Sequence, residues 1–166
     1  VTPADATFTG FVFKIQANMD PRHRDRMAFI RVCSGRFEKD MSVFHTRLNR
    51  PVRMSRPHRL FAQKRETVDE AYPGDVIGII NPGVFQIGDT ISLADGFNYK
   101  PLPQFQPEVF ARVRPTDTIM RKSFDKGIEQ LAREGTIQIL RSLDGQEFFV
   151  AAVGKLQFDV LEFRLQ

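Results

Sequence analysis

The chain has 166 residues, of which 42% are hydrophobic and 27% are charged, and its formal net charge is +4. These proportions are typical of a soluble globular protein and exclude a disordered or a membrane protein. No apolar run approaches the roughly 20 residues that span a bilayer, and the N-terminus lacks an apolar signal-peptide core. We therefore expect a cytoplasmic protein without a membrane partner. The single cysteine, Cys33, cannot form an internal disulfide, in agreement with a reducing compartment.

Positive charge is concentrated in the first part of the chain. Residues 1–65 contain 14 Lys or Arg against 5 Asp or Glu, a net charge of +9, whereas residues 66–166 contain 10 against 15, a net charge of −5. A polyanionic partner explains such a split, because Lys and Arg that neutralise phosphates release condensed counterions. A solvated basic surface explains it equally well. Charge alone does not separate the two hypotheses.

Two strands joined by a basic loop open the predicted fold. Apolar side chains alternate with others over residues 11–16 and 27–32, with Phe11, Phe13 and Ile15 on one side of the first strand. Asp20-Pro21 interrupts the strands, since proline has a fixed φ and no amide hydrogen. Four basic side chains of the loop are expected to point outward: Arg22, His23, Arg24 and Arg26.

A second basic site is predicted at a hairpin. Residues 42–48 and 52–55 read as its strands and Asn49-Arg50-Pro51 as its turn, with Pro51 at an edge position or a strand end because proline cannot donate to a ladder. Five arginines gather near this turn: Arg47, Arg50, Arg53, Arg56 and Arg59. With the four residues of the first loop they are the candidate contacts to RNA.

The other segments before residue 97 are short strands separated by turns. The run 76–80 is β-branched and can be buried on both faces, and turn signals fall at 71–75, 81–83 and 88–90. This pattern predicts a small all-β antiparallel barrel, whose closure removes exposed strand edges. Asp75 and Asp89 each follow a turn glycine, so we expect them to bind nearby backbone amides rather than to act in catalysis.

A proline-rich stretch, 100–106, predicts a linker between a barrel domain at 1–99 and a second domain at 107–166. In the second domain a strand is expected over 108–114. A helix should follow, capped by Thr116 or Asp117 and ending at Gly135, with Ile119, Phe124, Ile128 and Leu131 on one face.

Two further strands, 136–141 and 147–153, and a helix from Leu156 complete the predicted C-terminal part. The order strand, helix, strand, strand, helix is that of a split βαββα unit. It predicts an α+β domain of the ferredoxin-like kind without its last strand.

The sequence contains no candidate catalytic, cofactor-binding or metal-binding residues. A phosphate-binding loop needs Gly-Lys followed by Ser or Thr, and the one Gly-Lys pair, Gly154-Lys155, is followed by Leu156. His23, His45 and His58 are too scattered to suggest a metal site, and Cys33 offers no thiolate pair. No motif places a nucleophile beside a base. We therefore expect that the chain is not an enzyme by itself.

Several segments resemble one known family. They are Gln16-Ala17-Asn18-Met19-Asp20-Pro21, His23-Arg24-Asp25-Arg26, the run from Glu70 to Gly78 and the run from Val153 to Val160. Together they are similar to the second domain and part of the third of the bacterial peptide chain release factor three family of translational GTPases. The resemblance covers nearly the whole chain. It implies a translation-factor-type barrel followed by a truncated ferredoxin-like domain, and a parent that binds GTP or GDP with Mg²⁺ in a domain outside this chain.

The resemblance also implies a function. The parent would use GTP binding and hydrolysis to drive class I release factors off the ribosome after peptide release, and this chain would dock on ribosomal RNA and a small-subunit protein. Class I release factors would be reached only through the ribosome, and no DNA partner is implied. Two alternatives stay open: a free-standing β-barrel RNA-binding module, and the equivalent part of an elongation-factor-G-like protein. The first would need aromatic residues interleaved with the basic ones.

Overall fold

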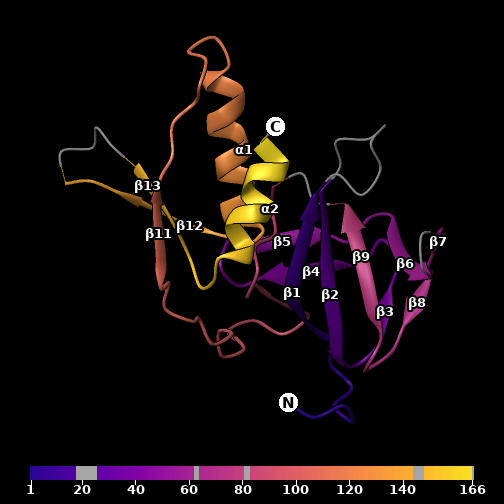
Figure 1. The fold of residues 1–166 in the computed structure, drawn as a ribbon. Coiled ribbons are helices and arrows are strands. Elements are labelled where there is room, and N and C mark those ends of the chain that lie inside the picture. Colours follow the sequence, from indigo (N-terminus) through magenta and orange to yellow (C-terminus); the bar gives the residue numbers. More distant parts are fainter. Residues whose placement is uncertain (18–25, 62–63, 81–82, 144–147, 166) are drawn as a thin grey trace. The chain divides into compact units, whose positions relative to one another are not determined.

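The computed structural model describes residues 1–17, 26–61, 64–80, 83–143 and 148–165 (Figure 1). The chain forms two compact units, Val1–Leu102 and Pro103–Gln166. The described part of the first unit contains only strands, and the second combines strands with helices. The predicted fold class, an antiparallel β-barrel-like unit followed by an α+β unit, is confirmed.

The first unit is built around one large antiparallel sheet. Its strands are β1 (Thr9–Ala17), β2 (Arg26–Ser34), β3 (Phe37–Glu38), β4 (Ser42–His45), β5 (Arg50–Arg53), β6 (Pro57–Phe61), β7 (Lys64–Thr67), β8 (Glu70–Ala71), β9 (Val76–Ile80) and β10 (Thr90–Ser92). Eight of them pair in the order β5-β4-β10-β1-β2-β9-β6-β7, while β3 pairs with β8. Figure 1 shows this sheet curving around an interior in the indigo-to-magenta half of the chain.

A β-bulge in β1 decides which of its side chains enter the core. The register of β1 on β2 shifts between Val12 and Lys14, so that Val12 and Ile15 are both buried in the barrel core. Phe11 and Phe13 lie outside that core, and Phe13 is 38% exposed. The expectation that Phe11, Phe13 and Ile15 share one face is therefore wrong, because the extra residue of a bulge inverts the alternation beyond it.

The β4–β5 hairpin turns earlier than predicted. Arg50 and Pro51 belong to β5, where they pair with His45 and Phe44, and the turn occupies residues 46–49. Asn49 closes it with a φ of +50°, a left-handed conformation that asparagine tolerates better than most residues. Pro51 costs no ladder hydrogen bond because β5 is an edge strand, as predicted.

The second unit consists of β11 (Val109–Arg112), α1 (Arg121–Arg133), β12 (Gln138–Arg141), β13 (Phe148–Ala152) and α2 (Leu156–Leu165). The strands pair antiparallel in the order β11-β13-β12, and the order of elements along the chain is the one predicted. A small core lies between sheet and helices, made of Ile128, Leu131, Ile137, Val150 and Leu161. In the described part of the chain, no helix is long and apolar enough to cross a bilayer.

Helix α1 begins later than expected. Its N-cap residue is Met120, whose side chain forms no capping hydrogen bond with the helix. Asp117 Oδ1 instead accepts a hydrogen bond from the Ile119 amide at 2.9 Å. The predicted cap at Thr116 or Asp117 is wrong because this local turn uses the carboxylate before the helix starts. Ile119 is 86% exposed, so it does not join the buried face. Gly135, with a φ of +76°, ends the helix as predicted.

Candidate nucleic-acid interface

The nine predicted RNA contacts divide into three groups. Arg22, His23 and Arg24 lie outside the described residues. Arg26 begins β2 and is half-buried, and Arg59 lies in β6 with Glu66 opposite it in β7. The remaining four lie on or beside the β4–β5 hairpin: Arg47, Arg50, Arg53 and Arg56.

Arg50 and Arg53 lie at the two ends of the edge strand β5, and both are exposed. Three positions separate them, so they project from opposite faces of the strand. Arg53 Nε lies 3.4 Å from Asp40 Oδ1, and the Arg53 side chain is still 69% exposed; such a surface pair is weak. Arg56 is exposed beyond the strand, with a φ of +52°. The edge of the sheet therefore presents guanidinium groups that can form bidentate contacts with phosphates.

Arg47 has a different role. Its Nε donates to Asp89 Oδ1 at 2.6 Å and its Nη2 donates to Asp89 Oδ2 at 2.9 Å. Nη2 also donates to the Val84 carbonyl at 2.8 Å. The hydrogen bonds to Asp89 raise the pKa of Arg47. Arg47 thus ties the hairpin turn to the segment before β10.

Asp89 is the buried anion that organises this corner of the barrel. Its Oδ2 accepts from the Gln86 amide at 2.7 Å and lies 3.0 Å from Nε2 of His45, whose side chain is fully buried. Burial alone would raise the pKa of Asp89, but hydrogen bonds from His45, Arg47 and Gln86 lower it to about 2. The Phe85 ring stacks on His45 with 5.5 Å between ring centroids. Asp89 is thus held as a carboxylate.

The structural role predicted for the two turn aspartates is confirmed. Besides the Asp89–Gln86 contact, Asp75 Oδ2 accepts a hydrogen bond from the Tyr72 amide at 2.9 Å. The prediction missed the two side-chain partners of Asp89. Arg47 is 42 positions away in sequence, and no local pattern signals a pairing at that distance.

The one Gly-Lys pair of the sequence lies directly before α2. The Gly154 amide donates to Gln157 Oε1 at 2.8 Å, and Gln157 Nε2 donates to the Thr136 carbonyl at 2.9 Å. The Gly154 amide is therefore bound within the turn that leads into α2. Within the described ranges, no three His, Cys, Asp or Glu side chains gather in a group that could hold a metal ion.

The segment after β10 folds back onto the barrel. Thr46 Oγ1 donates to the Phe97 carbonyl at 2.9 Å, and the Tyr99 amide donates to Thr90 Oγ1 at 3.0 Å. The Tyr99 hydroxyl lies 2.7 Å from Thr9 Oγ1. Burial is the main cause that raises the pKa of Tyr99 to about 12. Residues 97–102, called the strap below, thus belong structurally to the first unit.

Comparison with known proteins identifies the family. Residues 7–94 match the family model for elongation factor G domain 2, and residues 99–166 match that for the class II release factor RF3 C-terminal domain. Over its whole length the chain is 56% identical to peptide chain release factor 3 of Synechocystis sp. and of Trichormus variabilis, and 55% identical to that of Nostoc punctiforme. The chain belongs to the release factor 3 family.

The chain spans only 31% of the length of these release factor 3 relatives. A crystal structure of a Thermus thermophilus protein resembles it with a TM-score of 0.82 at 21% identity, over 98% of this chain and 24% of that one. At that identity the likeness concerns the fold. The resemblance of the motifs to the release factor 3 family is confirmed.

Proposed function

We propose that the chain is the ribosome-docking part of a GTPase that acts in translation termination. The observation that carries the proposal is its 55–56% identity, along its whole length, to proteins named peptide chain release factor 3. In this proposal the intact factor binds GTP or GDP with Mg²⁺ in another domain. After peptide release it promotes departure of class I release factors from the ribosome.

The barrel supplies the contact with ribosomal RNA in this proposal. Arg50 and Arg53 are exposed on the edge strand β5, Arg56 is exposed just beyond that strand, and Arg26 begins β2. Guanidinium groups at these positions would neutralise phosphates and orient the barrel without reading base sequence. Arg47 would contribute through its hold on the hairpin turn, since its guanidinium is bound to Asp89.

Two measurements test the proposal. The full-length factor should cosediment with ribosomes more strongly with a non-hydrolysable GTP analogue than with GDP, and the 166-residue chain should show no such nucleotide dependence. Calorimetry of the chain alone with GTP should give no saturable heat. Micromolar GTP binding by the chain, or no ribosome binding by the full-length factor in either nucleotide state, would contradict the proposal.

A further inference from the structure

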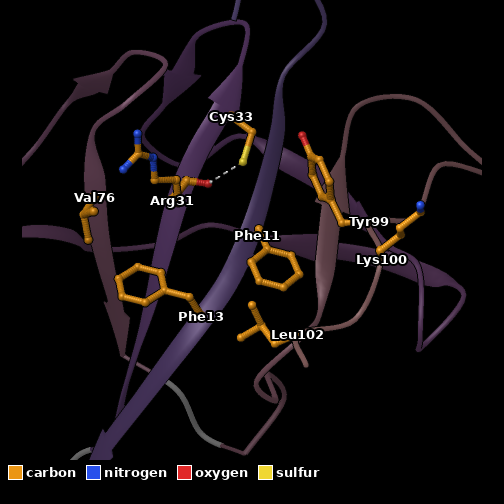
Figure 2. Close-up of a pocket in the computed structure, with 8 residues that line it drawn as sticks. All are labelled: Phe11, Phe13, Arg31, Cys33, Val76, Tyr99, Lys100 and Leu102. Atoms are coloured by element: carbon orange, nitrogen blue, oxygen red, sulfur yellow. Dashed lines mark hydrogen bonds between the residues drawn. The ribbon is translucent and has the colours of Figure 1, made fainter. Parts of the chain in front are cut away.

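The outer face of the barrel carries an apolar groove of about 410 Å³. Figure 2 shows Phe11 of β1 beside Leu102 of the strap, and Phe13 pointing toward the side of the groove where Val76 begins β9. Phe13, Val76 and Leu102 are 38%, 37% and 42% exposed. On the solvent side of an antiparallel sheet these positions would ordinarily be polar. Clustered exposed apolar side chains of this kind mark binding sites.

The wall formed by the strap is fixed before any ligand arrives. The Tyr99 ring packs edge-on against Phe11 at 5.8 Å and against Phe97 at 4.7 Å between centroids. Its hydroxyl lies 2.7 Å from Thr9 Oγ1, which is itself 2.6 Å from Ser34 Oγ. A preformed wall lowers the ordering cost of binding.

Two cations flank the groove. Arg31 of β2 and Lys100 of the strap both line it, on opposite sides of the view in Figure 2, and its lining contains no Asp or Glu. Within the described parts of the chain, neither side chain forms an ion pair. We propose that this groove binds an acidic segment of another protein, which inserts a large apolar side chain between Phe11, Phe13 and Leu102 and places carboxylates against Arg31 and Lys100.

A protein segment fits these observations better than RNA. Single-stranded RNA sites combine open aromatic faces with a continuous basic track along the backbone. Here the Tyr99 ring is committed to edge-on packing with two phenylalanines, and Val76 and Leu102 add aliphatic surface that bases cannot stack on. The groove is distinct from the β5 edge, so the inference goes beyond the proposed ribosome contact and stands without it.

Fluorescence anisotropy on the 166-residue chain tests the proposal with four labelled probes. The first is the peptide Asp-Glu-Asp-Leu-Phe-Glu-Asp-Glu. The second replaces Leu-Phe by Gly-Ser, the third replaces every acid by Lys or Arg, and the fourth is an octauridylate. We expect saturable binding of the first probe with a Kd below about 1 mM, and binding of each other probe weaker by about tenfold or more.

Variants locate the binding. Leu102→Glu, and separately the double change Arg31→Gln and Lys100→Gln, should each weaken binding of the first probe by about tenfold. The matched control is Lys122→Gln with Lys126→Gln, two exposed lysines of α1, which should leave it within about twofold. Equal binding of the first two peptides, or unchanged binding by both groove variants, would overturn the proposal. Preference for octauridylate would overturn it in favour of an RNA site.

Discussion

The two units of the chain differ in how completely they bury their apolar side chains. Among the described residues, the core of the first unit contains fifteen buried residues and the core of the second contains five. Of the sixteen large hydrophobic residues that are exposed in the described chain, ten belong to the shorter second unit, including Ile119, Leu143 and Phe163. Burial of apolar surface is the main source of folding free energy. We therefore predict that the first unit contributes most of the free energy of unfolding of the chain.

The largest expected effect comes from emptying the barrel core. Phe8 is fully buried and its ring lies 5.8 Å from that of Phe37, so Phe8→Ala should lower the free energy of unfolding by about 3–5 kcal/mol. Urea unfolding followed by tyrosine fluorescence measures this selectively, because both tyrosines, Tyr72 and Tyr99, lie in the first unit.

The matched change in the second unit is Phe163→Ala on α2, where the ring is 79% exposed. It should alter stability by no more than about 0.5 kcal/mol, measured by circular dichroism at about 222 nm because both described helices lie in that unit. Similar losses of unfolding free energy in Phe8→Ala and Phe163→Ala would show that the two units do not differ in this way.

The buried ion cluster gives the next largest effect. Asp89→Asn removes the charge that faces Arg47 and the fully buried His45, and should cost about 2–4 kcal/mol of barrel stability. Asp69→Asn is the control, since its side chain is 82% exposed and forms a surface ion pair with Lys39. An unchanged unfolding midpoint in the Asp89 variant would show that the cluster does not stabilise the barrel.

The pH dependence of stability follows from the same carboxylate. Its pKa in the folded state is about 2, against an unperturbed value of 3.8, so the unfolded chain binds the proton more readily. The contribution is complete well above pH 3.8 and is lost as the pH falls toward 2, by about 2 kcal/mol. Urea midpoints between about pH 6 and pH 2 should fall more steeply for the wild type than for Asp89→Asn. Parallel curves would count against this assignment.

Replacing a glycine by alanine in each unit should show the same difference in packing with smaller energies. A Cβ on Gly10 of β1 would lie 2.9 Å from Ile30 Cγ2 and 3.0 Å from Ile91 Cγ1 in the closed core, whereas one on Gly127 of α1 would meet only Leu165 Cδ2 at 2.7 Å. Gly10→Ala should therefore cost about 1–3 kcal/mol. Gly127→Ala should stay within about 0.5 kcal/mol of zero, because the mobile leucine end can yield and alanine favours a helix by up to about 1 kcal/mol. Equal costs in urea unfolding would contradict the account.

Proteolysis separates the strap from the linker. The sequence predicts a linker at 100–106, while Phe97 and Tyr99 are fastened to Thr46, Thr90 and Thr9. Phe105 is 74% exposed. Brief chymotrypsin treatment should cut after Phe105 and spare Phe97 and Tyr99, as read by mass spectrometry. Early cleavage after Tyr99 would show that the strap is not held.

Local patterns were enough to predict most of the fold. Alternating apolar residues marked the strands, Gly135 marked the end of α1, and Pro51 marked an edge strand. The bulge between Val12 and Lys14 could not be predicted from the sequence, because a one-residue shift in strand pairing leaves no recognisable pattern of residues. It is this bulge that brings Ile15 into the barrel core while Phe13 stays outside it.

The candidate sites were predicted less completely. The basic character of the hairpin was visible, but Arg47 could not be told from Arg50 or Arg53, since its partner Asp89 comes close only in the folded barrel. The groove was missed for the same reason. Leu102 lines the groove together with Phe11 and Phe13 because the strap folds back onto the barrel, and the proline-rich sequence does not predict this.

In the proposed function, the exposed arginines of the edge strand β5 dock the barrel on ribosomal RNA. Full-length factor carrying Arg50→Glu and Arg53→Glu should bind ribosomes more weakly than the wild type. Its log affinity should also depend less on log salt, with a slope smaller by about 2, because two phosphate contacts are lost. The melting temperature should stay nearly unchanged, since both side chains are exposed. Unchanged affinity and salt slope in the folded double variant would contradict the account.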